Sequence, residues 1–289
     1  MNDTACRVCG SATGTAGTVD SRFSGRPFHL RHCESCRFSF VQDPRTDYED
    51  LYAEGYYRGK GADPSVDYFR EMSDPRTVRS YEWQGVLDVV RSLVDVDPST
   101  EWLDYGCGLG GLVRYGRDRG IPKLVGFDVG YAARQARAMG IEVLDPAELE
   151  RAAGKFKVVT AIEVLEHMER PLDALRDVHR ALAQGGLFFF TTGNAAPFRG
   201  KLSTWHYVCP EVHVSFFEPQ TMDRALSLAG FRAEHRALTA PYEGIIRYKV
   251  LKRLGVPSQN PLEGVLPWGI MTRTVDRRLK VSAHPIGWK

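Results

Sequence analysis

The sequence predicts an α/β protein in which a parallel, doubly wound sheet follows a small cysteine-containing unit. Three observations support this fold class. Between residues 98 and 240, short apolar runs alternate with amphipathic stretches, as expected for parallel strands connected by helices. A glycine-rich turn, Gly106 to Gly111, joins the first of these strands to the helix that follows. Two Cys-x-x-Cys pairs lie before residue 45, in a stretch too short to bury a core of its own.

The cysteine pairs have the spacing of a metal site. Cys6 and Cys9 form one pair, and Cys33 and Cys36 form the other. Each pair can direct two thiolates at one ion, and four thiolates complete the tetrahedral shell of a structural zinc site. The N-terminus shows no secretion signal pattern, and in such a chain paired cysteines indicate zinc rather than disulfides. A shell closed by four thiolates has no open position, so we expect this zinc to be structural and not catalytic.

Residues 1–45 are therefore predicted to form a zinc ribbon whose folding free energy depends on the metal. Strands are expected at 28–31 and 38–41, and Asp43-Pro44 is expected to end the unit. A redox-active cysteine pair is the alternative. Such a pair would be expected near a catalytic βα turn rather than on a short N-terminal unit.

Residues 46–97 connect the ribbon to the main domain. The first part, 46–72, is rich in tyrosine and interrupted by glycines. Asp74-Pro75 predicts the start of a helix, because aspartate is a favoured N-cap and proline fits the first helical position. Apolar residues then recur every three or four positions, and Asp97-Pro98 is expected to stop the helix.

The core elements follow in alternation. Strands are expected at 101–105, 123–128, 141–144, 156–162 and 186–192, and helices near 110–119, 130–139, 146–153 and 170–184. The runs 158–162 and 187–190 are apolar on both faces, which is typical of central strands. Gly185-Gly186 is expected to end the preceding helix. Ligands of such a sheet bind at the carboxyl ends of its strands.

The last part of the chain is less regular. Glu218-Pro219 predicts a helix that ends at Gly230, and Phe231 begins a late strand. Residues 241–289 lack clear periodicity and are rich in arginine and lysine, so we expect a solvated extension packed on the sheet. A substrate lid, a contact to an anionic substrate and a dimer arm are alternatives. The predicted units are thus 1–45, 46–97, 98–240 and 241–289.

The glycine-rich turn indicates a nucleotide-like ligand. An apolar strand runs into Asp104, and the loop then reads Gly106-x-Gly108-x-Gly110. Glycines let the backbone turn tightly and approach a ligand, because no Cβ intervenes. The third glycine of a dinucleotide fingerprint would fall on Gly111, so the glycines alone do not exclude a dinucleotide. The acid before the loop favours a different ligand.

The stretch Asp104-Tyr105-Gly106-Cys107-Gly108-Leu109-Gly110 resembles motif I of the class I S-adenosylmethionine (SAM) methyltransferases. SAM has a cationic amino-acid tail and no pyrophosphate, so a carboxylate beside the loop suits it. The resemblance implies a Rossmann-like sheet that binds SAM through Asp104 and the loop glycines. The next strand ends at Asp128, where a carboxylate can accept both ribose hydroxyls. In this family an aromatic N-terminal segment often covers the cofactor, and residues 51–57 resemble that element. Packing of the ribbon against the main domain is the alternative.

Two further blocks resemble the same family. The sequence from Glu163 to His167 is similar to the E-x-L-E-H motif that follows the fourth strand, which implies that Glu163 lies beside the methionine part of SAM. His167 follows on the next turn, as a base or as a structural residue that pins the loop through a backbone hydrogen bond. Residues 214–231 resemble the C-terminal part of ubiquinone-biosynthesis-type methyltransferases.

A polar cluster follows the fifth strand. Methyl transfer from a sulfonium needs alignment and, for most acceptors, removal of a proton, so His and carboxylate residues at strand ends are candidates. Sugar C-methyltransferases with an N-terminal zinc module have a Tyr-x-x-Glu-His cluster at the matching place. The similarity implies that His213 is the general base, oriented by Glu211. His206 and then His167 are the alternatives.

Composition limits the range of partners. A formal net charge of +2 does not indicate a polyanion-binding protein, and 43% hydrophobic with 26% charged residues is typical of a globular domain. No apolar run reaches membrane-spanning length. We expect a cytoplasmic protein with a small-molecule substrate and without a membrane or nucleic-acid partner.

The sequence as a whole predicts a SAM-dependent methyltransferase that acts on carbon or oxygen of a sugar or natural-product intermediate. A zinc-ribbon RNA methyltransferase is one alternative, but residues 1–45 lack a basic and aromatic stripe. A non-catalytic SAM-binding protein is another, and the His/Glu cluster argues against it. The acceptor and the oligomeric state stay open.

Overall fold

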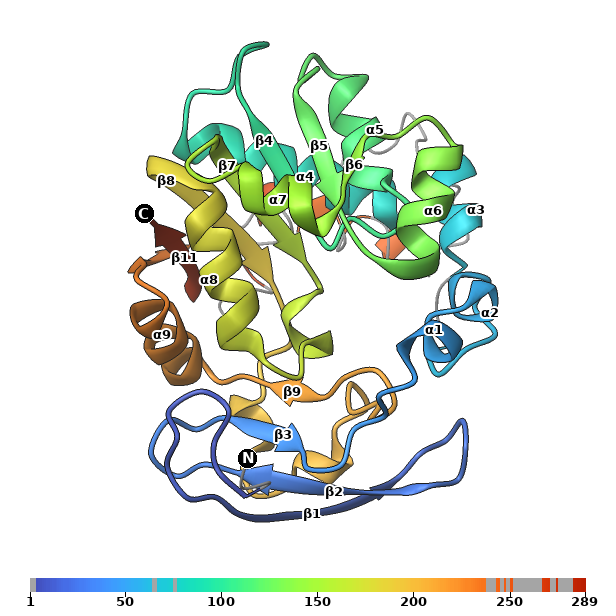
Figure 1. Ribbon diagram of the computed structural model, residues 1–289, viewed down its shortest axis with the longest axis vertical. Helices are drawn as coiled ribbons and strands as arrows, with labels where there is room; N and C mark the ends of the chain where they lie inside the picture. Colours follow the sequence, from blue (N-terminus) through green and yellow to red (C-terminus); the bar gives the residue numbers. More distant parts are fainter. Residues whose placement is uncertain are drawn as a thin grey trace.

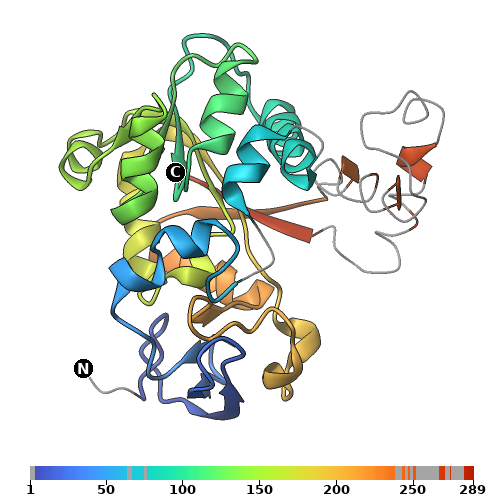
Figure 2. The same cartoon turned by 90° about the vertical axis from the view of Figure 1, so that its right-hand side faces the viewer.

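The computed structural model describes residues 4–63, 67–74, 77–237 and 283–289, together with a few positions between 243 and 274. Within these ranges the chain forms a seven-stranded sheet covered by helices and a separate four-stranded sheet (Figure 1). Three of the four strands of the smaller sheet belong to the N-terminal module, residues 4–45, which lies at the lower end of the molecule in both views (Figure 2). In the described residues, no helix combines the length and apolar character needed to cross a bilayer.

The N-terminal module is joined to the rest of the protein by backbone pairing. It contributes β1 (Gly14–Asp20), β2 (Pro27–His32) and β3 (Ser39–Val41), which pair in antiparallel order. The fourth strand, β9 (Ser215–Phe216), comes from the far end of the α/β domain and pairs with β3. The strands predicted at 28–31 and 38–41 are confirmed, whereas β1 and the pairing with β9 had no signal in the sequence.

Short helices connect this module to the central sheet. They are α1 (Tyr48–Leu51), α2 (Glu54–Tyr57) and α3 (Tyr68–Ser73), and the longer α4 (Val78–Leu93) follows them. Helix α4 begins at Val78 with Thr77 as its N-cap, later than the predicted start at Asp74-Pro75, because α3 occupies the preceding stretch. Pro75 itself lies outside the described residues.

The central sheet alternates with helices as predicted. Its parallel strands are β4 (Trp102–Tyr105), β5 (Leu124–Phe127), β6 (Val143–Leu144), β7 (Phe156–Ile162) and β8 (Leu182–Thr191). The helices between them are α5 (Gly111–Arg117), α6 (Gly130–Ala138), α7 (Pro146–Arg151) and α8 (Pro171–Ala181). With β10 (Arg232–Ala237) and β11 (Ala283–Trp288) at one edge, the strand order is β10-β11-β8-β7-β4-β5-β6, so the order reverses beside β4. A ligand of a doubly wound sheet binds at such a reversal, beyond the carboxyl ends of the strands.

Both faces of the central strands are apolar, as predicted. Trp102 and Phe189 pack into the cluster that contains α4, α5 and α6, while Leu103 and Phe188 pack into the cluster that contains α7, α8 and α9. All four side chains are fully buried. The sheet is therefore covered on both sides, which leaves its strand ends as the place where polar side chains gather.

The junction between α8 and β8 differs from the prediction. Helix α8 ends at Ala181 rather than near residue 184, and Gly185 and Gly186 lie inside β8. Gly185 has a φ of +73°, and its N–H donates to the Lys289 carbonyl at 3.0 Å. The Lys289 N–H donates to the Gly186 carbonyl at 3.1 Å. The glycines thus receive the end of the chain instead of terminating a helix.

The C-terminal part supplies an inner strand. Helix α9 (Pro219–Leu228) and β10 (Arg232–Ala237) match the predicted helix and late strand. Strand β11 (Ala283–Trp288) then inserts between β10 and β8, antiparallel to both. The prediction that 241–289 is a solvated extension is therefore wrong for its last residues, and most of 241–282 lies outside the described part.

Because β11 is an inner strand of the sheet, we expect its buried side chains to contribute to the free energy of unfolding. Ile286 is fully buried, so Ile286→Ala should lower the free energy of unfolding by about 2–4 kcal/mol through lost packing and a residual cavity. Ile270, which is 67% exposed, is the matched control from the same part of the sequence. Urea unfolding of both variants is the measurement. Equal stability of Ile286→Ala and Ile270→Ala would show that β11 is not part of the folded core.

Candidate active site

The glycine-rich loop joins β4 to α5 at the reversal of strand order. Gly106, Gly108 and Gly110 have φ values of +76°, +55° and +79°, a region that other residues rarely adopt. A Cβ added to Gly106 would lie 2.6 Å from Val164, and one added to Gly110 would lie 2.7 Å from Ile141. The loop conformation and its close packing therefore both require glycine.

Two carboxyl groups flank this loop. Asp104, only 4% exposed, accepts a hydrogen bond from the Thr160 hydroxyl at 2.8 Å. Asp128 accepts from the N–H groups of Gly108 and Val129, each at 2.7 Å. Burial raises the pKa of Asp104 to about 7 and the pKa of Asp128 to about 6, the latter against the opposing effect of its two backbone hydrogen bonds. Each carboxylate would be stabilised by a ligand that brings positive charge or hydrogen-bond donors.

These groups line a cavity of about 530 Å³, here called the loop cavity. Its opposite wall is aromatic and is formed by Tyr48, Tyr52, Tyr56, Tyr57 and Tyr68 from the connecting segment, with Tyr131 from α6. The rings of Tyr57 and Tyr131 stack at 5.6 Å between centroids. The described tyrosines of the segment 46–72 thus line the predicted ligand site beside the glycine-rich loop.

A second cavity of about 990 Å³ shares wall residues with the first, including Tyr56, Arg79, Glu163 and His167. We call it the hairpin cavity, because residues 19–23 of the β1–β2 hairpin form part of its wall. The segment 60–63 and residues of the loop 203–213 also line it. The N-terminal module is therefore a wall of this cavity rather than a distant appendage.

Two glutamates and a tyrosine lie at the junction of the cavities. The Tyr207 hydroxyl is 2.8 Å from Glu163 Oε2 and 2.6 Å from Glu166 Oε1, and Thr192 donates to Glu166 Oε2 at 2.8 Å. Burial, followed by repulsion from Glu166, raises the pKa of Glu163 to about 7. Glu163 also has a φ of +55°, which a non-glycine residue rarely adopts. A phenol has one proton, so Tyr207 can donate to only one of the two carboxyls at a time.

His167 and His213 face each other beside this pair. The Nδ1 atom of His213 is 2.7 Å from the Tyr207 carbonyl oxygen, and the Nδ1 atom of His167 is 3.0 Å from the Val212 carbonyl oxygen. A carbonyl only accepts, so each Nδ1 carries the proton and each Nε2 has a free lone pair. Burial lowers the pKa of both imidazoles, to about 3 for His167. Both are therefore neutral near pH 7 in this structure.

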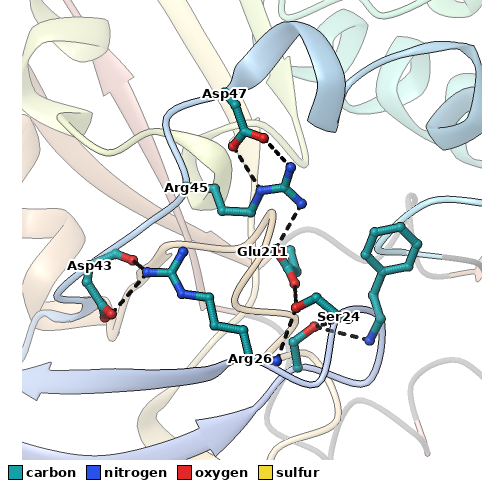
Figure 3. A network of polar contacts seen from close by, with 8 residues as sticks. Ser24, Arg26, Asp43, Arg45, Asp47 and Glu211 are labelled. Carbon is teal, nitrogen blue, oxygen red and sulfur yellow. Dashed lines mark hydrogen bonds and ion pairs between the residues drawn. The ribbon is translucent and has the colours of Figure 1, made fainter.

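Glu211 does not have the role predicted for it. Ser24 donates to Glu211 Oε1, and Arg45 approaches Glu211 Oε2 at 3.4 Å (Figure 3). The carboxyl is 2% exposed and points to the N-terminal module, while His213 is oriented by the hydrogen bond that its Nδ1 donates to the Tyr207 carbonyl. The predicted Glu211–His213 pairing is corrected accordingly. His206 is exposed on the wall of the hairpin cavity.

The four predicted cysteine ligands come together in the N-terminal module. Cys6 Sγ and Cys36 Sγ are 3.5 Å apart, as are Cys9 Sγ and Cys33 Sγ, and all four sulfurs lie within 4.8 Å of one another. Thiolates around a tetrahedral zinc ion with bonds near 2.3 Å are about 3.8 Å apart. The donor set therefore fits a zinc ribbon.

Three residues of the site had no assigned role in the sequence prediction. Glu166 is the second glutamate of the E-x-L-E-H motif, and this position could have identified it as a site residue. Thr192 reaches Glu166 because it directly follows β8, whose last residue pairs with Ile162 at the end of β7. Tyr207 lies in the loop that follows, and no local sequence pattern indicates its contacts with the glutamates.

Comparison with known proteins places the sheet in a family. The sequence profile of a family described as "Methyltransferase domain" matches residues 77–236. The malonyl-[acyl-carrier protein] O-methyltransferase of Enterobacter lignolyticus is 28% identical over 162 residues, which are 53% of this chain and 63% of that protein. The ubiquinone biosynthesis O-methyltransferase of Pseudomonas paraeruginosa is 34% identical over 105 residues, which are 33% of this chain and 45% of that protein. The chain thus spans less than two thirds of the length of either relative.

A solved structure shares the fold. It is described as the complex between the Haloferax volcanii Trm112 methyltransferase activator and the putative methyltransferase. The TM-score is 0.50 at 16% sequence identity, over 78% of this chain and 99% of the other. At this identity the likeness concerns the fold alone.

Because Glu211 contacts Ser24 and Arg45, we expect the loop 203–213 and the N-terminal module to stabilise each other. Glu211→Ala should lower the free energy of unfolding by about 1–3 kcal/mol, because Ser24 and Arg45 lose a buried partner. Glu34→Ala, which removes an exposed partner of Arg37, should change stability by less than about 0.5 kcal/mol. Thermal unfolding of the two variants tests this. A Glu211→Ala protein as stable as Glu34→Ala would contradict the coupling.

Proposed function

Because the chain belongs to the methyltransferase-domain family, whose profile matches residues 77–236, we propose that the protein transfers a methyl group from SAM to a small molecule. In this reaction the bond between the sulfonium sulfur and the methyl carbon breaks as the acceptor atom bonds to that carbon. S-adenosylhomocysteine leaves, and an acceptor proton passes to a base or to solvent. The enzyme has to align the two reactants and to make the acceptor nucleophilic.

The observation that carries this proposal is the junction of the two cavities at Glu163 and His167. The loop cavity has the glycine turn, the paired acids and the aromatic wall that a nucleoside with a cationic tail would use. The hairpin cavity opens on the other side of the same residues. A methyl donor in the first cavity would present its methyl group to an acceptor in the second.

We assign the cofactor contacts as follows. Asp128 accepts the ribose hydroxyls with lone pairs that its two backbone hydrogen bonds leave free. The glycines of the loop let the backbone approach the nucleoside. Asp104 and Glu163 lie where carboxylates can offset the positive charge of the amino-acid tail.

The acceptor in this proposal is a sugar or natural-product intermediate methylated at oxygen or carbon. Oxygen is favoured because both relatives compared above are named O-methyltransferases. The hairpin cavity, about 990 Å³ in volume, and the near-neutral net charge support a small molecule rather than a nucleic acid. Glu166, His167 and His213 form the group that meets the acceptor. We also assign a structural zinc ion to the four-cysteine cluster, whose sulfur spacing supports it.

The assignment of Asp128 can be tested by calorimetry. Asp128→Ala should weaken SAM binding by roughly 2–4 kcal/mol, since charge-assisted hydrogen bonds to the ribose are lost. Asp118→Ala, at an exposed aspartate just after α5, is the control and should bind SAM as the wild type does. Circular dichroism confirms that both variants are folded. Unchanged SAM affinity in Asp128→Ala would remove this residue from the cofactor site, and no SAM binding by the wild type would refute the function.

The raised pKa values predict a pH dependence. Asp104 and Glu163 both have a pKa of about 7, so they lose their negative charge as the pH falls through that value. A cationic ligand then loses its counter-charge, and SAM affinity should fall by up to about tenfold for each group between pH 8 and pH 6. Asp104→Asn and Glu163→Gln should each remove part of this dependence. A SAM dissociation constant that stays constant over this range would contradict the placement of the cationic tail.

A further inference from the structure

Three side chains at the junction of the cavities have donor atoms that converge. One ligand atom from each of Glu166, His167 and His213 lies within 4.8 Å of the others. Glu166 is fully buried and His213 is 7% exposed. Glu166 and His167 belong to the 3-10 turn η1 (Leu165–His167) after β7, whereas His213 precedes β9. The three are therefore brought together by the fold and not by one local motif.

Both histidines are fixed in the tautomer that metal coordination requires. Each Nδ1 lies within hydrogen-bond distance of a backbone carbonyl, that of Val212 for His167 and that of Tyr207 for His213. The Tyr52 hydroxyl is also 3.1 Å from His167 Nδ1 and accepts when this nitrogen carries the proton. A metal-bound histidine almost always donates its other ring N–H to a carbonyl, a carboxylate or water. Nε2 is then the atom that each ring offers, and its lone pair is available without any change of tautomer.

Glu166 has the supporting contacts of a coordinating carboxylate. Thr192 donates to one oxygen at 2.8 Å, and the Tyr207 hydroxyl is 2.6 Å from the other. Hydrogen bonds of this kind orient metal-bound carboxylates and leave a lone pair on each oxygen. Glu163 shares the same tyrosine, while Arg79 of the common wall pairs with Glu82 instead. Two buried carboxyls thus lie together, and a cation beside them would offset their desolvation and mutual repulsion.

We propose that Glu166, His167 and His213 bind one divalent metal ion, of the Mn²⁺, Fe²⁺ or Zn²⁺ kind, at the floor of the hairpin cavity. Two imidazoles and one carboxylate form a three-sided ligand set that leaves further coordination positions open. Bonds near 2.1 Å require ligand atoms roughly 3 to 4 Å apart, and the three side chains already bring one ligand atom each to within 4.8 Å of the others. This site differs from the four-cysteine cluster, whose thiolates favour soft ions.

The inference rests on the proposed function and specifies its acceptor. An ion at this place faces the hairpin cavity beside Glu163 and His167, which border both cavities. A hydroxyl or enol oxygen of the acceptor can occupy an open position, and the ion lowers the proton affinity of that oxygen as a Lewis acid. The proton leaves to solvent, the oxygen bonds to the methyl carbon, and the carbon–sulfur bond breaks. Substrates with a metal-binding oxygen are therefore the expected class.

Mn²⁺ alone is a suitable probe, because oxygen and imidazole ligands accept it and a zinc-filled thiolate cluster does not. Titration of Mn²⁺ into the zinc-loaded protein, with free Mn²⁺ followed by electron paramagnetic resonance, should show one Mn²⁺ per chain. His213→Ala and Glu166→Gln should each weaken Mn²⁺ binding by at least about tenfold. His235→Ala is the matched control, because His235 is exposed and pairs with Asp223 away from the site. Equal Mn²⁺ binding by all three variants and the wild type would overturn the proposal.

A crystal of the wild-type protein with Mn²⁺ makes the test independent of variant stability. The anomalous difference map should place a peak between Glu166, His167 and His213. Its absence at saturating Mn²⁺ would overturn the metal site. Calorimetry with SAM on the same sample separates the two proposals. SAM binding without a Mn²⁺ peak means that only the metal inference fails, whereas no SAM binding means that the proposed function fails.

Discussion

The pairing of β3 with β9 fixes the side of the protein on which an acceptor would bind. Val41 N–H donates to the Val214 carbonyl at 2.9 Å, and Val214 N–H donates to the Glu166 carbonyl at 2.8 Å. One short strand is thus held between the N-terminal module and the turn after β7. Because His213 directly precedes Val214, its position relative to Glu166 and His167 depends on the same hydrogen bonds. The module therefore acts as part of the site's framework.

The two cavities are built by different kinds of constraint. The loop cavity depends on local conformation, because the positive φ values of Gly106 and Gly110 and the absence of a Cβ belong to the loop itself. The hairpin cavity depends on contacts between distant segments, such as that of Ser24 with Glu211. Related proteins can therefore keep the conformation of the glycine-rich loop while the segments around the hairpin cavity vary. Variation of this kind lets one fold serve many reactions.

The sequence predicted those elements correctly whose structure depends on residues close together in the chain. Apolar runs predicted all five parallel strands, and the acid and glycines around Gly106 predicted the loop that β4 leads into. The prediction failed where a partner lies far along the chain. Gly185-Gly186 was interpreted as a helix end, because nothing nearby reveals that Lys289 pairs with it. Glu211 was paired with His213 from the similarity to a Tyr-x-x-Glu-His cluster, yet Ser24 and Arg45, far earlier in the chain, contact its carboxylate.

We infer that the N-terminal module holds the proposed acceptor side in place, whereas the proposed cofactor side folds without it. Hydrogen–deuterium exchange of the intact protein before and after zinc chelation tests this most directly. Amide protection should fall in β1 to β3 and in residues 203–216. Protection in β4, β5 and the glycine-rich loop should stay unchanged. Retained protection of 203–216 without zinc, or loss of protection across the whole central sheet, would contradict it.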